Sequence, residues 1–485
     1  MLGFNVLLVT LLADYIYAVN ASIQTRSSVN ATILGGSKVA MAWYAGWHAT
    51  DFPLSSVSWE KYTHMTYAFA VTTPDPGQLS LVDSDEELLP QFVKAAHQHA
   101  TTLSVGGWTG SRYFSTNVGS AQNRSTFVKS VVDVVKKYEL DGLDFECVDY
   151  YTYTFDYPLN DFSPFSWEYP NRQGLGCNMI NSNDTANFLL FLQELRKDPV
   201  GAKMVLSTAT SIQPWNDTNG VPSTDLSGFG QVFDFITIMN YDLWGATSPS
   251  AGPNAPLNDT CADQSNRVGS AVTSVKAWSN AGIPLNKIVL GVPAFGHSFV
   301  VDKADAFQSG STTELASFPR FNAKAAHSGD KWDSEGGLDV CGNYVGPSGV
   351  FAFRGLIDSG YLGSNGTAKD GIAFKYDTCS QTPYVYNSQT QTLISFDDAD
   401  SFAAKGDFIK TTGLKGFAIW EAAGDSGDIL LDSILYSTAN GNPNPRKSES
   451  GNSNNSQGNA ASAIRVHLDG HILLFLLSIV TFALL

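Results

Sequence analysis

Eight apolar segments recur along the chain, with segments of helical periodicity between them. Nearly continuous apolar strands are typical of a parallel sheet that is buried on both faces. Residues 183–197 and 270–282 show helical spacing with plausible starts or stops. The pattern predicts the α/β class and a closed (β/α)8 TIM barrel, whose functional residues lie at the C-terminal ends of its strands. The eight segments are VAMAWYAGW (39–47), HMTYAFA (64–70), TTLSVGGW (101–108), LDGLDFE (140–146), KMVLSTAT (203–210), FDFITIMNYD (233–242), KIVLGVPAFG (287–296) and GFAIW (416–420).

The interval between the seventh and eighth segments is too long for a single helix. We expect residues 297–375 to form a small α+β insertion that walls one side of the cleft, within a domain spanning residues 38–436. After about residue 440 the composition changes to PNPRKSESGNSNNSQGN, which cannot bury a core, so residues 441–465 are interpreted as a polar linker.

Both ends of the chain resemble processing signals. FNVLLVTLLADYIYA is typical of a secretory signal peptide, here residues 1–18. At the other end, residues 466–485 follow small residues and a spacer, which is the arrangement of a GPI-anchor signal. The alternative is a single membrane-spanning tail, although its fifteen apolar residues would rise only about 22 Å as a helix. Together with many N-x-S/T sequons, these signals predict a secreted glycoprotein at the cell surface or cell wall, held to the membrane only by a lipid anchor.

The composition of the chain limits the classes of molecule that it is expected to bind. The net charge of -17 argues against nucleic acid or an anionic membrane, because phosphate binding needs clustered Lys and Arg. A neutral ligand fits better, and 12% aromatic residues allow sugar stacking as well as core packing. The eight histidines show no metal-binding spacing, so neither a metal nor a cofactor is expected. An odd count of five cysteines leaves one unexplained, and Cys147 is the candidate.

Five motifs occur in order at the ends of the predicted strands, and with them the chain resembles a fungal-type chitinase of glycoside hydrolase family 18 over residues 38–436. The resemblance implies a monomeric enzyme that hydrolyses β-1,4-linked N-acetylglucosamine polymers with retention, the substrate's own acetamide attacking the anomeric carbon. Chitin or chito-oligosaccharides would be the partners. The motifs are SVGG (104–107), DGLDF (141–145), MNYD (239–242), GVPAFGHSF (291–299) and GFAIW (416–420).

The resemblance also assigns roles to single residues. Tyr241 would contact the acetamide, Asp242 a sugar hydroxyl, and Trp420 would form the floor under the distorted sugar. Asp141 and Asp144 match the first two acidic positions of the family pattern D-G-x-D-x-D-x-E and are expected in the catalytic set. Further substrate contacts are expected from Met239, Trp108 and Tyr44. Trp43, Trp47, Trp108 and Trp244 each suit a sugar subsite or ordinary core packing.

The acidic motif is interrupted after Phe145. Its third acidic position falls on Glu146, and the proton donor would fall on Val148, which cannot donate a proton. One interpretation is that the donor is lost and the protein is an inactive chitin-binding lectin or a cell-wall surface protein on the same fold. In the other, the motif resumes at Trp167-Glu168-Tyr169-Pro170, with only Ser166 in place of an expected Asp, and Glu168 is the donor.

A translated intron would explain the interruption. Codons allowed for residues 146–148 can spell an intron donor, and those for Ser166 can spell an acceptor after the pyrimidine-rich codons of residues 162–165. Removal of the bases from the third position of codon 146 to the second position of codon 166 preserves the reading frame, and the joined codon encodes Asp, which gives DGLDFDWEYP. It also removes Cys147 and leaves an even number of cysteines. The alternative is a genuine loop. The hypothesis assigns the proton donor to Glu168.

Overall fold

The computed structural model describes residues 31–81, 84–96, 99–107, 110–146, 170, 177–325, 328–339 and 341–442. The predicted signal peptide, the segment 147–166, the predicted anchor signal, Glu168 and Trp108 lie outside the described residues. The described residues belong to one compact unit.

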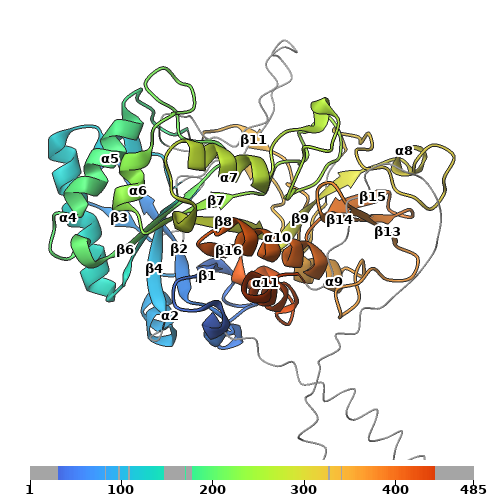
Figure 1. Cartoon of the computed structure of the whole chain (residues 1–485), viewed down its shortest axis with the longest axis horizontal. Helices are drawn as coiled ribbons and strands as arrows, with labels where there is room; N and C mark the ends of the chain where they lie inside the picture. The colour runs from blue at the N-terminus through green and yellow to red at the C-terminus, as the bar shows by residue number, and fades with distance from the viewer. Residues whose placement is uncertain are drawn as a thin grey trace, which may run out of the picture. The chain divides into compact units, whose positions relative to one another are not determined.

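A closed parallel barrel forms the core of this unit (Figure 1). Each strand is parallel to its neighbours, and β1 pairs with both β2 and β16, which closes the ring. The predicted (β/α)8 barrel is therefore confirmed. All eight strands fall within or beside the predicted apolar segments. They are β1 (Val39–Ala45), β2 (His64–Thr72), β4 (Ala100–Gly106), β5 (Gly142–Glu146), β6 (Val205–Thr210), β7 (Phe235–Met239), β8 (Ile288–Pro293) and β16 (Gly416–Trp420). A short strand, β3 (Leu79–Ser80), pairs antiparallel with β2.

Helices cover the outside of the barrel. The two segments predicted as helical are confirmed, as α5 and α7, and α7 begins at a capping box in which Ser270 and Thr273 satisfy each other's backbone N–H groups. The described α-helices are α2 (Leu89–Ala95), α3 (Phe114–Val118), α4 (Ala121–Tyr138), α5 (Asp184–Leu195), α6 (Ser227–Val232), α7 (Ala271–Asn280), α10 (Ala399–Thr412) and α11 (Ile429–Asn440), and the shorter α8 (Lys303–Ala306) and α9 (Phe353–Asp358) lie between β8 and β16 in the insertion.

The buried side chains form two clusters, one on each face of the barrel wall. Alternate residues of a strand point to opposite faces. On β1, Val39, Met41 and Trp43 belong to a cluster inside the barrel, with members from β6, β7, β8 and β16. Ala42 and Tyr44 belong to the larger cluster between the barrel and its helices.

An α+β insertion lies between β8 and β16, as predicted, but its extent was predicted wrongly. Its five-stranded antiparallel sheet has the order β12-β9-β15-β14-β13 and lies beside the barrel on the right of Figure 1. The sheet spans residues 295–395 rather than 297–375, because two strands that complete it follow the predicted end. The strands are β9 (Phe295–Val300), β12 (Val350–Ala352), β13 (Ala373–Asp377), β14 (Thr382–Asn387) and β15 (Thr392–Ser395), with a separate hairpin of β10 (Gly337–Leu338) and β11 (Tyr344–Val345).

Two disulfides connect loops of the barrel with the insertion. Cys177, which precedes α5, bonds Cys341 in the β10–β11 turn, and Cys261, which follows β7, bonds Cys379 between β13 and β14. The Cα atoms of each pair are 5.8 Å apart. Both bonds use cysteines other than Cys147. Among the described helices, none is both long and apolar enough to cross a membrane.

Candidate active site

Asp144 lies inside the barrel on β5 and is fully buried. Ser104 on β4 and Ser207 on β6 are its direct neighbours in the sheet register. Their hydroxyls donate to Asp144 Oδ2 and Oδ1 at 3.0 and 2.6 Å, and the Trp43 indole N–H donates to Oδ2 at 3.0 Å. Burial raises the pKa of Asp144, although the three hydrogen bonds favour the charged form and act against that shift. Burial thus favours the protonated form of this carboxyl group, and the three donors favour its ionised form.

Glu146 lies two residues further along β5, on the same face and at the C-terminal end of the strand. Its carboxylate is buried, and Ser104 Oγ lies 3.3 Å from Glu146 Oε2 as well as 3.0 Å from Asp144 Oδ2. One hydroxyl hydrogen can be donated to only one carboxylate at a time. Ser104 therefore links the two acidic side chains.

Tyr241 and Asp242 follow β7 at the same end of the barrel. Tyr241 and Met239 are buried in the inner cluster, and the partly buried Trp420 packs against it. Asp242 has a left-handed backbone (φ 59°), and its N–H donates to Asn254 Oδ1 at 2.8 Å. Its carboxylate is 28% exposed and lies 2.6 Å from Nε2 of the buried His297 on β9, so the insertion holds a carboxylate that still faces solvent.

An aromatic row leads outward from the inner cluster. Trp420, the last residue of β16, meets Trp43 edge-on at 5.7 Å between ring centroids and stacks on Phe69 at 5.6 Å. Phe69 in turn stacks on Trp47 at 5.9 Å. Trp47 is 46% exposed, so the row reaches the surface. Flat apolar rings in a row are the kind of surface on which sugar rings stack.

Glu421 ties the end of β16 to the loop after β1. Its Oε1 lies 2.5 Å from His48 Nδ1, and its Oε2 accepts from the Ala45 N–H at 3.2 Å. The His48 ring stacks on Trp332 of the insertion with 4.1 Å between centroids. Glu421 directly follows Trp420. The contact between Glu421 and His48 therefore fixes the backbone segment that carries the Trp420 ring.

The family model for glycosyl hydrolases family 18 matches residues 39–425. This span contains the barrel, the insertion and all the side chains described above. The chain belongs to this family. Two chitinase-like effectors are similar over most of the chain: one from Moniliophthora roreri is 51% identical, covering 83% of this chain and 93% of the relative, and one from Moniliophthora perniciosa is 51% identical, covering 82% and 86%. The solved structure of a chitinase from Rhizomucor miehei has a TM-score of 0.70 and 33% identity, covering 82% of this chain and 99% of that one.

Asp141 is not part of the family 18 site in this structure, contrary to its assignment to the catalytic set. It is exposed and lies before the first residue of β5, at the opposite end of the strand from Glu146. Asp141 Oδ2 accepts from the Thr101 N–H at 2.8 Å, which joins the starts of β4 and β5. The carboxylate therefore has a structural role.

Tyr44 and Trp244 also lie outside the site. Tyr44 faces the helices, packs on Tyr67 and Phe92 and donates its hydroxyl to the Phe52 carbonyl at 2.9 Å, and burial raises its pKa to about 12. The prediction of a substrate contact was wrong because the alternation on β1 turns Trp43 inward and Tyr44 outward. Trp244 is buried beside Phe318, so it serves core packing.

The structure brings Asp144, Tyr241, Asp242, Met239 and Trp420 to one end of the barrel. Glu168 and Trp108 cannot be placed, because they lie outside the described residues. The sequence analysis missed Ser207, Phe69, His297 and Glu421. Ser207 had a signal, since it is a polar residue in the middle of an apolar strand segment. Phe69 gave none, since it matches an ordinary strand residue, whereas His297 is a polar residue within the GVPAFGHSF motif.

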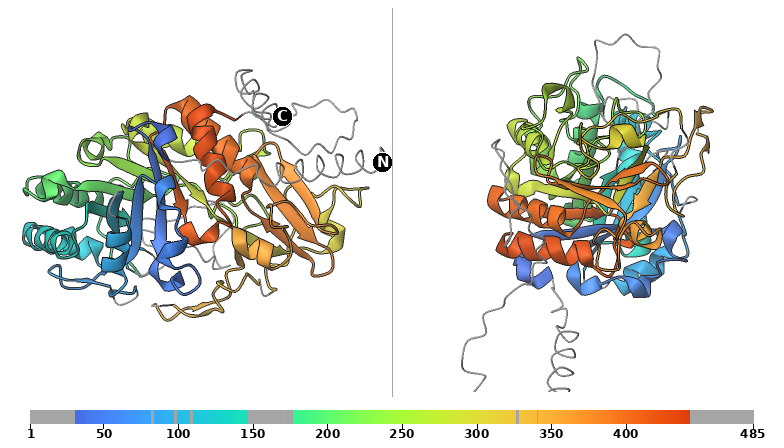
Figure 2. Two further views of the ribbon diagram at one scale, coloured as in Figure 1. Left: turned by 90° about the horizontal axis from the view of Figure 1, so that it is seen from below. Right: turned by 90° about the vertical axis from the view of Figure 1, so that its right-hand side faces the viewer.

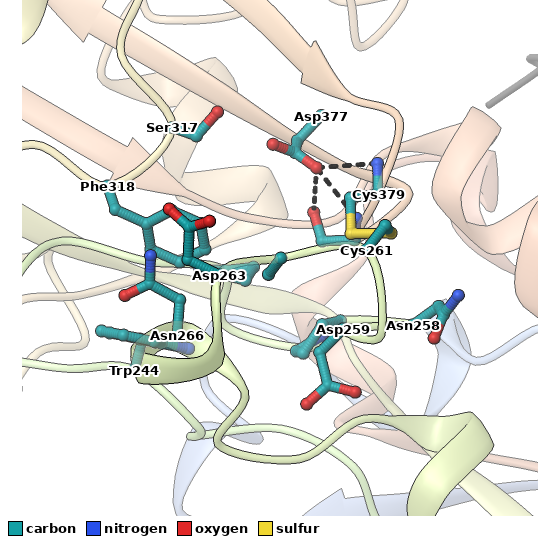
Figure 3. Close-up of a pocket in the computed structure, with 14 residues that line it drawn as sticks. Trp244, Asn258, Asp259, Cys261, Asp263, Asn266, Ser317, Phe318, Asp377 and Cys379 are labelled. Carbon is teal, nitrogen blue, oxygen red and sulfur yellow. Dashed lines mark hydrogen bonds between the residues drawn. A yellow bond between two sulfur atoms is a disulfide. The ribbon is translucent and has the colours of Figure 1, made fainter. Parts of the chain in front are cut away.

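A cavity of about 250 Å³ lies beside the Cys261–Cys379 disulfide, and it contains none of these site residues (Figure 3). Two of its acidic groups accept local hydrogen bonds: Asp377 Oδ1 accepts from the N–H groups of Cys379 and Ser380, and Asp259 accepts from Ser270 Oγ at 2.9 Å. Within the described part of the chain, no group of three or more His, Cys, Asp or Glu side chains could hold a metal ion.

Proposed function

We propose that this protein binds chitin oligosaccharides at the mouth of its barrel and hydrolyses their β-1,4 bonds with retention. The observation that carries the proposal is the pair of buried carboxylates on β5, Asp144 and Glu146, which share the Ser104 hydroxyl. A glycosidase that uses the substrate's acetamide as nucleophile needs a carboxylate to orient that acetamide. Asp144 lies below that carboxylate and can take up a proton. In its protonated form it adds no negative charge, so the carboxylate above it can remain ionised.

In the proposed reaction, Glu168 donates its proton to the glycosidic oxygen while the acetamide oxygen bonds to the anomeric carbon. The resulting Glu168 carboxylate then takes a proton from the water that opens the oxazolinium intermediate. Tyr241 contacts the acetamide oxygen, Asp242 binds a sugar hydroxyl, and Trp420 lies under the distorted sugar. The acetamide-orienting carboxylate is at position 146, which is Glu here and becomes Asp when residues 147–166 are removed.

Two forms of the protein test this proposal: the full chain, and the form in which 141–170 is shortened to DGLDFDWEYP. We expect the short form to hydrolyse chitotetraose and colloidal chitin. Its Glu168→Gln variant should lose about 10²- to 10⁴-fold in kcat and still bind chitotetraose. Binding by both forms without any hydrolysis would contradict the enzymatic proposal. Mass spectrometry of the native protein identifies its natural form, because a peptide containing VDYYTYTFDYPLND is made only when residues 147–166 are retained.

A second candidate function is chitin binding without hydrolysis. One observation favours it: both relatives at 51% identity are named chitinase-like effectors. A protein that only binds chitin would show unchanged affinity in the Glu168→Gln variant and no turnover in either form. The two candidates therefore differ in the activity assay and agree in the binding assay.

We also propose that the protein is secreted. The apolar segment in residues 1–18 supports export, and so do the two disulfides, because such bonds persist in oxidising compartments. Residues 466–485 would then direct a GPI anchor that holds it at the cell surface or wall. Release of the native protein from intact cells by phosphatidylinositol-specific phospholipase C would support this anchor, and resistance to the enzyme would argue against it.

A further inference from the structure

A hairpin on the insertion exposes two large apolar side chains at its centre. We call residues 330–345 the strap; of these, 330–339 and 341–345 are described. Leu338 of β10 and Tyr344 of β11 are direct cross-strand partners, so their side chains share one face. They are 75% and 74% exposed. Two exposed apolar side chains on one face of a hairpin make that face a candidate binding surface.

The amino-terminal part of the strap is fixed to the loop after β1. The Trp332 ring stacks on His48, and its indole N–H donates to Asp51 Oδ2 at 2.7 Å. Lys331 Nζ lies 2.9 Å from the same oxygen, and the Arg354 guanidinium lies 5.2 Å from the Trp332 ring centroid. Because His48 and Arg354 both pack on it, the Trp332 ring acts as an anchor.

Two aspartates fix the strap to its own sheet. Asp330 Oδ2 accepts from the Ala352 N–H at 2.7 Å, and Asp333 Oδ2 accepts from the Gly349 N–H at 2.9 Å. The strap therefore leaves the insertion in a defined direction. In Figure 2 (left) its gold ribbon reaches from the orange sheet of the insertion toward the blue strands of the barrel.

The tip of the strap is fixed to the loop that follows β5. Cys341 bonds Cys177, and Asp339 Oδ1 accepts from the N–H groups of Cys341 and Asn343, which shapes the turn. An isolated two-stranded hairpin is marginally stable in water. Anchors at both ends thus hold an exposed pair that packing would not keep in place. Both anchor loops follow the C-terminal ends of barrel strands, which is the end that carries Glu146.

We propose that Leu338 and Tyr344 form an accessory platform for a polymer of β-linked N-acetylhexosamine that extends beyond the barrel mouth. This inference rests on the proposed function. The platform lies on the rim that carries the candidate site, so a chain bound there can continue onto it. The net charge of -17 disfavours polyanions and anionic membranes. A phenol ring beside an apolar side chain suits the face of a neutral sugar and the methyl group of its acetamide.

The test compares Tyr344→Ala and Leu338→Ser with Tyr436→Ala, a control on α11 whose side chain is 40% exposed. Depletion isotherms on insoluble chitin particles measure binding to a long ligand. Calorimetry with chitotetraose measures binding to a short one. We expect each strap variant to bind particles about 3- to 10-fold more weakly, with unchanged affinity for chitotetraose. The control should match the wild type in both assays. A Cys177→Ser/Cys341→Ser double variant, which frees the tip, should behave like the strap variants.

Unchanged particle binding in both strap variants would overturn the inference and leave the proposed function intact. An equal loss of affinity for particles and for chitotetraose would also overturn the inference, because it would place the effect in the barrel mouth or in folding. A wild-type dimer that the variants convert to monomer without losing particle binding would assign the pair to a second copy of the chain. A wild type that binds neither ligand would overturn the proposed function itself.

Discussion

Asp144 receives hydrogen bonds from Trp43, Ser104 and Ser207, yet its pKa is raised. Complete removal from water penalises the charged form more than three donors favour it. The protein thus keeps a carboxyl group with a desolvation penalty inside its barrel, where an apolar residue would pack without this penalty. Such a group is expected where it serves chemistry, because structural sites seldom need a buried acid without a cationic partner.

This residue makes folding stability depend on pH. The unfolded chain has an Asp pKa near 3.9, and the folded pKa of Asp144 is higher. The stability that the protonated group contributes is therefore complete below about pH 4 and is lost as pH rises through the folded pKa. Asn cannot ionise, so an Asp144→Asn variant should gain melting temperature relative to wild type between pH 4 and pH 7. It should also lose about 10-fold or more in activity.

Differential scanning fluorimetry across this pH range, with kcat measured in parallel, checks both expectations. Asp141→Asn is the matched control, because Asp141 is exposed at the other end of β5. If wild type gained stability over Asp144→Asn as the pH rose, the charged form would be the favoured one and the assignment of the raised pKa would be wrong.

At the scale of strands and helices, the sequence was sufficient to place the barrel. Strands such as KIVLGVPAFG and GFAIW are apolar on both faces, and this pattern has few alternatives to a buried parallel strand. The same property hides which face a residue occupies, so Tyr44 was assigned to the site although it points toward the helices. The insertion was also cut short, because β15 joins its sheet by pairing with β9, which is distant in sequence, and β14 lies between β15 and β13.

The alternation on β1 predicts different effects on activity for two neighbouring substitutions. Trp43→Phe removes the indole N–H that bonds a buried carboxylate, so activity toward chitotetraose should fall with a stability cost of about 1.5–3 kcal/mol. Tyr44→Phe removes only a hydrogen bond to the Phe52 carbonyl, so stability should fall by about 1 kcal/mol with kcat/KM unchanged. Urea unfolding and steady-state kinetics separate the two. A loss of kcat/KM in Tyr44→Phe at 25 °C would return Tyr44 to the site.

At the scale of the whole molecule, the insertion and the barrel are joined by polar contacts and disulfides as well as by chain connectivity. His297 reaches Asp242, Glu421 binds the histidine that stacks on Trp332, and both disulfides cross the same boundary. None of these pairings follows from spacing along the sequence, since each joins residues that are tens to hundreds of positions apart. The insertion is therefore positioned by long-range contacts that a strand-by-strand prediction does not reveal.

The Cys261–Cys379 bond should stabilise this arrangement without taking part in catalysis. It closes a loop with a sequence separation of 118, and neither cysteine bonds a residue of the candidate site in the described contacts. Replacing both cysteines by Ser should lower the free energy of unfolding by about 2–4 kcal/mol and leave kcat at 25 °C unchanged. Guanidinium unfolding of wild type and variant measures the loss. Full reduction with dithiothreitol is the control, because it should bring the two proteins to the same midpoint. An intact midpoint with reduced kcat would show that this bond positions the site rather than stabilising the fold.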